Sequence, residues 1–411
     1  MLRVSVRNHH DAHLRVVVPH PDTSADRSLQ CRYLSPVPHP DVAVVFPQAH
    51  QRGGVERIAW DLMHHLVHQG RSVAFVGEQL AIGASADIEH VHVAPARGLP
   101  RPLAFRRAAV AVLAKLGPTN TITLGANCPP GDILMVQSVH RSWLRSARTV
   151  PFAGHDIPAA VRYLMPRHQV LLGLEQAYFR SERPRAVLCC SSREASDLKA
   201  LYGVAAGKLH VVPNGYDPAV FHPCRAADRA AIRRQMGVTD NDVVLLLMAN
   251  ELHRKGFGPL VQAVAANGDP RLRVAVVGKA DIASYAGELA ALGLTDRVRW
   301  YGPTSDAAAW YAACDVLTLP TQYEPFGLVI VEALATGLPV ITTRLAGASD
   351  AVQPGVNGLL QDDPYDVAEL AGLLHEALDD PTRARWASSA AGSVKRFQHE
   401  TVFQQVVDQL T

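Results

Sequence analysis

The sequence lacks any hydrophobic run long enough to span a membrane. The longest apolar candidate, residues 243–249, has the length of a strand, whereas a membrane helix needs about 18 apolar residues. Residues 1–10 contain no apolar core of the length found in signal peptides. These absences predict a cytoplasmic protein.

Motifs for metal, disulfide and dinucleotide chemistry are also missing. The six cysteines form no Cys-x-x-Cys pair and show no metal-ligand spacing, so we expect buried, reduced thiols. We find no acidic D-x-D cluster where it would hold a divalent ion together with a diphosphate, and we expect no metal. The G-x-G-x-x-G fingerprint is absent, which argues against a hydride-transferring dehydrogenase.

The composition that is present is typical of a soluble globular protein. Apolar residues make up 48% and charged residues 19% of the 411 residues, and this length suggests two domains. The net charge of +2 hides an asymmetry. Residues 1–200 contain 23 Lys or Arg and 15 Asp or Glu, whereas residues 201–411 contain 17 and 23. The basic first half indicates an anionic partner on that side.

Apolar strands alternate with helices in two series along the chain. This alternation predicts an α/β fold of two Rossmann-like domains, whose parallel sheets face an interdomain cleft. We expect a weakly ordered N-terminal extension at residues 1–40, a first domain at 41–215, and a second domain at 216–411 that ends in helices. Periodicity leaves open whether the last helix returns to the first domain. The expected strands are residues 42–46, 72–76, 132–137, 186–190, 209–212, 242–249, 273–277, 298–301, 316–319 and 339–342.

The stretch from Glu324 to Glu332 is the most informative motif. It separates two carboxylates by a loop-forming segment, Pro325, Phe326 and Gly327, and an apolar helix. Glu324 should lie at the carboxyl end of a strand, where open α/β sheets bind ligands, and Glu332 roughly one to two turns into the helix. Gly327 should open that helix and leave its free N–H groups to a ligand. This arrangement suits a polyhydroxylated, phosphate-bearing ligand, although solvated glutamate pairs are common.

Two further loops supply candidates for the same site. Arg254-Lys255-Gly256 follows an expected strand and precedes a helix, and two adjacent cations in that position suit a diphosphate. Gly53-Gly54 follows the first expected strand and starts a helix, where a glycine pair lets the backbone approach a ligand closely. A solvated loop and an ordinary turn are the alternatives for these two segments.

His140 and two basic stretches lie in the first half of the chain. His140 follows the strand expected at residues 132–137, where it could hydrogen-bond a sugar hydroxyl, orient an acceptor, or lie at the surface. Arginines interspersed with apolar residues occur at residues 97–115 and 141–167. Such stretches bind anionic membrane surfaces or form solvated helix faces, and both interpretations stay open.

With these motifs the chain resembles the retaining glycosyltransferases of family 4 (group 1), which have the GT-B fold. The resemblance covers residues 42–400 and is most specific at the Glu-x7-Glu motif and the Gly-Leu-Pro-Val-Ile that follows it. Residues 254–256 and 53–57 match the family's donor-diphosphate and glycine-loop elements. Residues 174–215 are most similar to lipopolysaccharide core glucosyltransferases. The family often has glycine where this chain has Ala280, which leaves the nucleotide base open.

The resemblance implies a role for each candidate residue. Glu332 would hold the ribose hydroxyls of the nucleotide, and Glu324 would hold the donor sugar. Arg254 and Lys255 would neutralise the diphosphate leaving group, whose departing oxygen takes the acceptor's proton. His140 would lie near the sugar on the acceptor side. The backbone N–H groups that would face sugar and phosphate belong to Phe326, Gly327 and Leu328.

We therefore expect a hexosyltransferase that uses a nucleotide-diphosphate sugar, with retention, in cell-surface glycan or lipopolysaccharide synthesis. Its partners would be the donor, a glycan or glycolipid acceptor, and an anionic membrane touched peripherally from the inner face of the plasma membrane, but no nucleic acid. A nucleotide-sugar 2-epimerase and a non-catalytic sugar-nucleotide or glycan-binding protein are the alternatives. The expected catalytic residues are Glu324, Arg254, Lys255 and His140, and the expected donor-binding residues are Gly53, Gly54, Arg254, Lys255, Glu324, Phe326, Gly327, Leu328 and Glu332.

Overall fold

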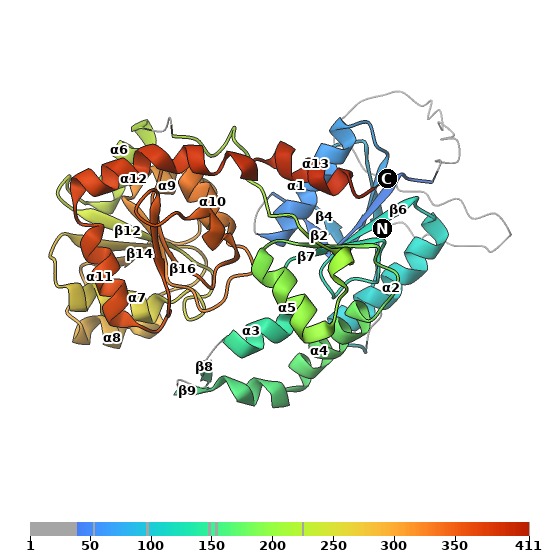
Figure 1. The fold of residues 1–411 in the computed structure, drawn as a ribbon, viewed down its shortest axis with the longest axis horizontal. Helices are drawn as coiled ribbons and strands as arrows, with labels where there is room; N and C mark the ends of the chain where they lie inside the picture. Colours follow the sequence, from blue (N-terminus) through green and yellow to red (C-terminus); the bar gives the residue numbers. More distant parts are fainter. Residues whose placement is uncertain are drawn as a thin grey trace, which may run out of the picture. The chain divides into compact units, whose positions relative to one another are not determined.

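The computed structural model of the chain describes residues 39–51, 54–95, 98–146, 149–152, 155–223 and 226–410. The extension expected at residues 1–40 therefore lies almost entirely outside the described residues. Within them, two sheets form the centres of two lobes (Figure 1). We call residues 41–212 together with 399–410 the N-lobe, and residues 226–397 the C-lobe.

The N-lobe is built on a seven-stranded sheet in which every neighbouring pair is parallel. Its strands are β1 (Val42–Val45), β3 (Val73–Gly77), β5 (Ile88–His92), β6 (Asn120–Leu124), β7 (Ile133–Val136), β10 (Ala186–Cys189) and β11 (Leu209–Val211). Their order is β11-β10-β7-β6-β1-β3-β5. The central strands are buried on both faces, which explains their continuous apolar sequences.

The C-lobe is built on a six-stranded sheet that is also parallel throughout. Its strands are β12 (Val243–Met248), β13 (Leu272–Val277), β14 (Val298–Trp300), β15 (Val316–Leu319), β16 (Val340–Thr343) and β17 (Gly358–Gln361). Their order is β14-β13-β12-β15-β16-β17. The carboxyl ends of β12 and β15, which are neighbours in the sheet, carry the loops that hold most of the predicted site.

Helices connect the strands and cover the sheets. Several begin at a side chain that accepts a hydrogen bond from a backbone N–H in the first turn, among them Ser191, Asp306, Asp366 and Asp379. The helices are α1 (Val55–His68), α2 (Arg101–Leu116), α3 (His140–Ser146), α4 (Pro166–Phe179), α5 (Ser192–Tyr202), α6 (Ala226–Met236), α7 (Phe257–Asn267), α8 (Ala286–Ala291), α9 (Ala307–Ala313), α10 (Leu328–Ala335), α11 (Val367–Glu376), α12 (Asp380–Ser393) and α13 (His399–Val407).

Smaller elements complete the described part of the chain. Strands β2 (Gln48–Ala49) and β4 (Gln79–Leu80) form a parallel pair, and β8 (Thr149–Phe152) and β9 (His155–Pro158) form an antiparallel pair. A 3-10 segment, η1 (Ala159–Leu164), leads into α4. In the stretches that the structure describes, no helix combines the length and apolar character required to cross a bilayer.

The predicted architecture of two Rossmann-like domains with parallel sheets is confirmed, whereas the residue limits of the domains stay a prediction. All ten expected strands are present, with ends that differ by no more than one residue. The strands of the two small pairs, β2, β4, β8 and β9, were not expected, and neither were three strands of the two main sheets. β5 is an edge strand with polar residues, β6 alternates Thr with apolar residues, and β17 begins with glycine. None of the three has the continuous apolar run by which the other strands were recognised.

The last helix returns to the N-lobe, which settles the question that periodicity left open. Phe403 and Val406 of α13 are buried in one apolar cluster with Ile58 and Leu62 of α1. The chain therefore crosses between the lobes twice. Two backbone hydrogen bonds join these crossings. Tyr216 N donates to Phe397 O (2.9 Å), and His399 N donates to Tyr216 O (3.0 Å). Figure 1 shows both crossings between the lobes.

We predict that Phe403→Ala lowers the free energy of unfolding by about 3 kcal/mol, because it leaves a cavity where α13 packs on α1. Phe403 is 2% exposed. Thr401→Ala, on the exposed side of the same helix, should change it by less than about 0.5 kcal/mol. Urea unfolding of both variants measures the difference. Equal midpoints for the two variants would show that α13 does not contribute to the stability of the N-lobe.

Candidate functional site

The loop after β15 carries Glu324 and leads directly into α10. Gly327 caps this helix with a φ of 96°, and a Cβ at this position would stand 3.0 Å from Glu324 Cγ, so glycine suits the turn. Gly347 N donates to Glu324 O (2.9 Å), and Ala348 N donates to Phe326 O (2.7 Å). These contacts fix Glu324 at the carboxyl end of the sheet, where the sequence placed it.

Glu324 contacts both cations that were predicted to bind a diphosphate. Its Oε2 accepts from Lys255 Nζ and, at 3.2 Å, from Arg254 Nη1. Arg254 Nη1 also donates to Tyr323 O (2.8 Å), and Arg254 Nε donates to Glu251 (2.9 Å). Two loops of the C-lobe thus bring these three predicted residues into one ion-paired group.

Backbone contacts hold the two loops together. Arg254 O accepts from Gln322 N (3.0 Å) and from Thr321 Oγ1 (3.0 Å). The side chain of Gln322 donates to His253 O (3.1 Å). Gly256 has a φ of 79°, and a Cβ there would collide with Pro320 O. The cations are therefore held in place by the fold of the loops as well as by Glu324.

Burial is the largest influence on the ionisation of this group. It opposes charge on Glu324, but the charges of Lys255 and Arg254 outweigh it and hold the pKa of the carboxyl below its ordinary value. Burial also lowers the pKa of the Lys255 ammonium, which Glu324 only partly offsets. Glu324 is therefore an ionised hydrogen-bond acceptor at neutral pH and not a proton donor.

Glu332 does not contact this group and has partners of its own. It lies within α10 with 3% of its surface exposed, and its Oε2 accepts from the Tyr311 hydroxyl of α9 (2.9 Å). Its Oε1 accepts from Arg57 of α1, so this ion pair joins the two lobes. The charge of Glu332 raises the pKa of Arg57. Both oxygens of the carboxylate predicted to bind ribose are thus hydrogen-bonded within the protein.

The remaining donor-site candidates are Gly53, Gly54, Phe326 and Leu328. Gly53 lies outside the described residues. Gly54 caps α1, and the space where its Cβ would stand is open. The side chain of Phe326 is buried in the C-lobe core, with its ring centroid 6.1 Å from that of Phe397, so only its backbone can face a ligand. Leu328 is the first residue of α10.

His140 is the first residue of α3 in the N-lobe. Its backbone N donates to the buried carboxylate of Glu175, which holds the start of the helix. Its ring Nε2 shares a hydrogen bond of 3.0 Å with His168 Nδ1. Burial, followed by the neighbouring His168, lowers the pKa of His140 to about 4, so the imidazole is neutral at neutral pH.

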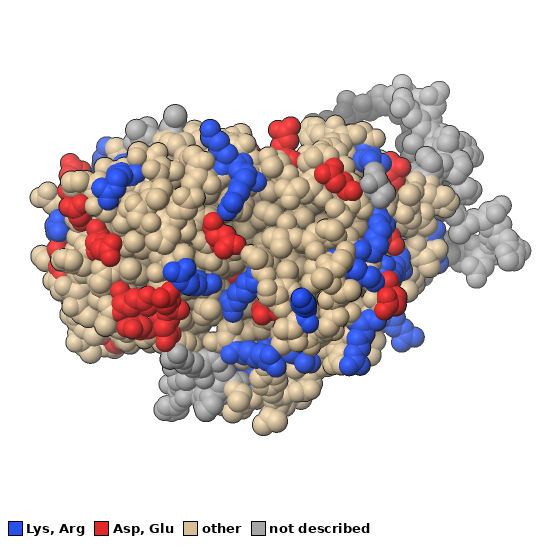
Figure 2. All heavy atoms as spheres, viewed as in Figure 1, with Lys and Arg blue, Asp and Glu red and all other residues tan. Residues whose placement is uncertain are grey.

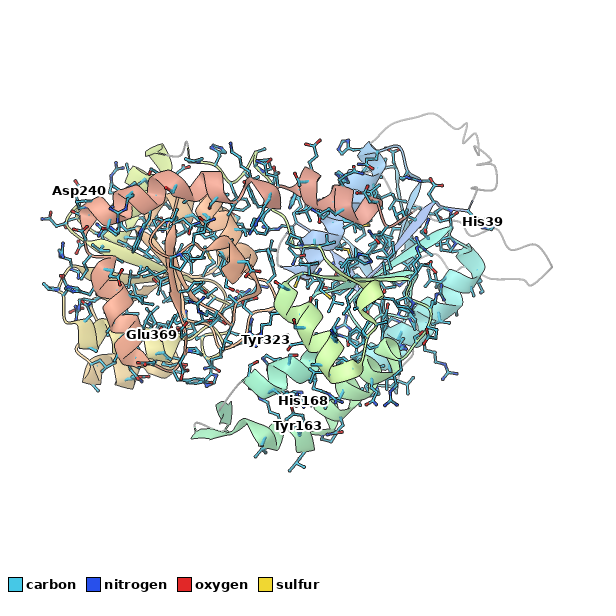
Figure 3. The ribbon with its side chains drawn as sticks, in the orientation of Figure 1. His39, Tyr163, His168, Asp240, Tyr323 and Glu369 are labelled. Carbon is cyan, nitrogen blue, oxygen red and sulfur yellow. The ribbon has the colours of Figure 1, made fainter. Side chains whose placement is uncertain are left out.

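Tyr323 connects His140 to the loop that carries Glu324. Its hydroxyl accepts from Val139 N (3.1 Å) and donates to Val139 O (3.2 Å). Val139 directly precedes His140 and Tyr323 directly precedes Glu324, so these contacts bring the two segments together. Pro325 O, in the same loop, accepts from Ser191 Oγ of the N-lobe (3.1 Å). Tyr323 is 6% exposed. Figure 3 labels it at the point where the C-lobe loop meets the N-lobe.

No role was predicted for Arg57, Tyr311 or Tyr323, although all three contact predicted residues. Arg57 belongs to the glycine-loop segment, and Tyr323 directly precedes Glu324. Their positions beside these motifs were the features of the sequence that could have predicted a role for them. Tyr311 lies in an alanine-rich helix with no such neighbour. Its role becomes visible only when α9 packs beside α10.

A D-x-D sequence does occur, at Asp240 and Asp242, but it precedes β12 and so lies at the opposite end of that strand from Arg254. Asp242 accepts from Thr239 N (2.7 Å) and pairs with Arg273 (2.9 Å). Figure 3 shows Asp240 and Tyr323 on different sides of the C-lobe. Among the residues described, no three His, Cys, Asp or Glu side chains are grouped to hold a metal ion. The absence of a metal stays a prediction.

A second charged group lies where the chain crosses between the lobes. Asp61 is one turn beyond Arg57 on α1, and its Oδ2 is 3.6 Å from His399 Nε2 of α13. Burial raises the pKa of Asp61 to about 7, with Asp217 and Glu332 adding to the rise and Arg57 opposing it. Burial also lowers the pKa of His399 to about 4. This group titrates near neutral pH through Asp61.

Two family models match the chain, Glycosyltransferase Family 4 over residues 52–220 and Glycosyl transferases group 1 over residues 228–392. A D-inositol 3-phosphate glycosyltransferase of Xylanimonas cellulosilytica is 32% identical over 277 residues, which cover 65% of this chain and 63% of the relative. The chain spans between about half and two thirds of the length of the curated relatives it matches.

Solved structures with the same fold include WaaG and Alr3699/HepE. WaaG, a glycosyltransferase involved in lipopolysaccharide biosynthesis, superimposes with a TM-score of 0.76 at 19% identity, over 90% of this chain and 99% of WaaG. Alr3699/HepE of Anabaena, in complex with UDP and glucose, superimposes with a TM-score of 0.68 at 22% identity, over 90% and 99%. These similarities confirm the predicted GT-B fold.

We predict that Asp61→Asn changes the pH dependence of stability. The raised pKa means that the folded protein keeps a proton on Asp61 that the unfolded chain has released, so wild-type stability falls between about pH 4 and pH 7. The variant should lack this fall and gain about 1–3 kcal/mol over the wild type at pH 8, and little at pH 4. Urea unfolding across this pH range measures how the free energy of unfolding of wild type and variant depends on pH. Asp240→Asn is the exposed control. Parallel slopes for Asp61→Asn and wild type would contradict the assignment.

We predict that Tyr323→Phe lowers the free energy of unfolding by about 1–3 kcal/mol, because it removes the hydroxyl that bonds Val139 and leaves a buried N–H without this partner. Tyr163→Phe, at a half-buried position of the N-lobe, is the matched control and should change it little. Denaturant unfolding compares the variants. An unchanged midpoint for Tyr323→Phe would mean that this contact does not hold the lobes together in solution.

Proposed function

Because the chain belongs to the glycosyltransferases of family 4 and group 1, we propose that it transfers a hexose from a nucleotide-diphosphate sugar to an acceptor hydroxyl with retention of configuration. We place this reaction in the cytoplasm or on the inner face of the plasma membrane, in the synthesis of a cell-surface glycan or lipopolysaccharide. The two basic stretches would then contact anionic lipid.

The observation that carries this proposal is the contact of Glu324 with Arg254 and Lys255 beside the first turn of α10. A donor diphosphate would take both cations, whose positions are set in advance by the loops around them. Glu324 would then accept hydrogen bonds from hydroxyls of the donor sugar. The N–H groups at Gly327 and Leu328 would stabilise the charge that grows on the leaving phosphate, without a divalent ion.

The nucleotide part of the donor would bind at Glu332. Ribose hydroxyls need the carboxylate oxygens that Tyr311 and Arg57 occupy in this structure. Ribose binding would therefore compete with the Arg57 contact, which belongs to the other lobe. In this proposal, donor binding and the contact between the lobes are coupled through one carboxylate.

The acceptor is the part of the reaction for which the relatives differ. Curated relatives are named for D-inositol 3-phosphate, and WaaG is named for lipopolysaccharide biosynthesis. A phosphorylated cyclitol and a lipopolysaccharide core glycan are therefore the first acceptors to test, with other glycolipids after them.

The proposal is tested by incubating the protein with a panel of nucleotide-diphosphate hexoses, with and without these acceptors. Transfer of the sugar, with the donor's anomeric configuration found in the product by NMR, would support it. Conversion of a donor to its 2-epimer without acceptor would instead identify an epimerase. Donor binding without turnover under all conditions would favour a non-catalytic binding protein.

We predict that Lys255→Ala and Arg254→Ala each lower kcat for transfer by about 100-fold or more, because each removes charge that stabilises the departing diphosphate. Arg299→Ala removes an exposed arginine from β14 of the same lobe and should leave kcat unchanged. Initial rates at saturating donor measure the effect. Circular dichroism and thermal unfolding of each variant check the fold. Wild-type rates in the folded variants would remove the diphosphate assignment.

A further inference from the structure

Two arginines, Arg162 and Arg167, lie close to the histidine pair of the N-lobe. Arg162 lies in η1 and Arg167 in the first turn of α4, beside His168. In the part of the chain that the structure describes, no carboxylate forms an ion pair with either arginine, whereas Arg254 and Lys255 of the C-lobe are both paired. On the face shown in Figure 2, several Lys and Arg side chains lie where Figure 1 places α3, α4 and α5.

These side chains are held in fixed positions by stacking and hydrogen bonding. The guanidinium carbon of Arg162 lies 4.2 Å from the centroid of the Trp143 ring. Trp143 in turn packs against His140, with ring centroids 5.4 Å apart, and His140 stacks on His168 at 5.1 Å. Arg167 Nε donates to His168 Nε2 (3.3 Å). Arg162 is half-buried and Arg167 is exposed, and a contact with an aromatic or imidazole ring orients each of them before a ligand binds.

The hydrogen bonds also settle the protonation of the two imidazoles. A guanidinium can only donate, so His168 Nε2 accepts from Arg167 and the proton of His168 lies on Nδ1. His168 then donates to His140 Nε2, which leaves the Nδ1–H of His140 as a donor. Burial and the two arginines lower the pKa of His168, in agreement with a neutral ring. The positive charge of the cluster thus comes from Arg162 and Arg167 alone.

The cluster lies beside the proposed donor site. Val139, directly before His140, is hydrogen-bonded to Tyr323, which directly precedes Glu324. Across the lobes, the charge of Glu251 acts on Arg162, and Glu251 is bonded to Arg254. In Figure 3, His168 lies on the N-lobe near the start of α4, below Tyr323. An acceptor bound at this cluster would approach the donor sugar from the N-lobe side.

We propose that Arg162 and Arg167 bind a phosphate group of the acceptor, so that the acceptor substrate is a phosphate-bearing polyol and not a neutral glycan. This inference rests on the proposed transfer function. Two guanidinium groups match the charge of a phosphate monoester, which is close to −2 at neutral pH, and each can bind it through two N–H groups. The diphosphate of the donor has its own cations, Arg254 and Lys255, so it leaves this pair free.

The phosphate could belong to a soluble polyol phosphate or to a lipid headgroup. Leu164, between the two arginines, is 81% exposed, and Val161 is 38% exposed, so apolar side chains stand beside the cations. This arrangement would suit a headgroup at a lipid surface as well as a free phosphate. The recognised chemistry is the same in both cases, and the experiment separates the two sources.

The first experiment compares acceptors that differ only in phosphate. Initial rates are measured with inositol 1-phosphate, glycerol 3-phosphate and glucose 6-phosphate against inositol, glycerol and glucose. A lipid arm uses vesicles of phosphatidylinositol in phosphatidylcholine against phosphatidylcholine alone. Transfer to a phosphorylated member of a pair, with at least tenfold lower kcat/KM for its unphosphorylated counterpart, is the expected result. Equal kcat/KM within each pair would overturn the proposal, and so would transfer only to neutral acceptors.

The second experiment uses variants of the full chain. Arg162→Ala and Arg167→Ala should each raise the acceptor KM at least tenfold, with a much smaller change in the donor KM. Arg162→Lys should recover part of the loss, because it keeps the charge without the planar fork. Arg180→Ala, at the other end of α4, is the matched control. A rise in the donor KM instead would assign the cluster to the donor and overturn the proposal.

A binding measurement covers the case in which no acceptor on the panel reacts. Calorimetric titration with inorganic phosphate, with UDP already bound, should show a site that the Arg162→Ala/Arg167→Ala double variant loses at least tenfold in affinity. Unchanged phosphate affinity in the folded double variant would overturn the proposal. So would a loss of binding to anionic vesicles with no loss of phosphate binding, which would identify a membrane-docking surface. Failure of the proposed function would look different, with neither transfer nor hydrolysis of any donor by the wild type.

Discussion

The ionised carboxylate of Glu324, half-buried beside Lys255 and Arg254, makes the interaction on which the site depends. Adjacent cations repel each other, and burial opposes charge on Lys255, so a neighbouring anion favours the charged form of both in the positions that the loops give them. Removing one partner of such a buried pair typically costs about 3–5 kcal/mol, because a charge is left uncompensated. A diphosphate carries the charge needed to take the place of Glu324 between them. The ion pair thus keeps the cations charged and positioned for an anionic ligand.

The contacts between the lobes are arranged around the same loop. Tyr323 holds it to Val139, and Ser191 bonds Pro325 O on its other side. Glu332, in the helix that the loop opens, is held by Arg57 of the N-lobe. A group bound at either acid would therefore act on contacts that join the lobes, because Glu332 itself, and Tyr323 directly before Glu324, make those contacts.

The sequence was sufficient for the fold and for the group of Arg254, Lys255 and Glu324, but not for the contact of Tyr311 with Glu332 in the same lobe. Continuous apolar strands marked most of both sheets, and the loops with Arg254, Lys255 and Glu324 could be placed because each follows such a strand. It was insufficient for pairs between the lobes. Arg57 and Glu332 are 275 residues apart, and Val139 and Tyr323 are 184 apart. Local pattern carries no information on such pairs, because they form only when two independently patterned sheets pack together.

The charges of the two lobes differ in how they are balanced. In the C-lobe, the acids that follow the strands and the cations of the neighbouring loop neutralise each other, so a donor has to replace a protein contact. In the N-lobe, Arg162 is stacked on Trp143 and Arg167 donates to His168, and neither contact supplies negative charge. Two fixed cations close to a neutral histidine pair keep an unbalanced field, which attracts an anion from solution. In the proposed reaction, a donor side that exchanges anions would therefore face an acceptor side that gains one.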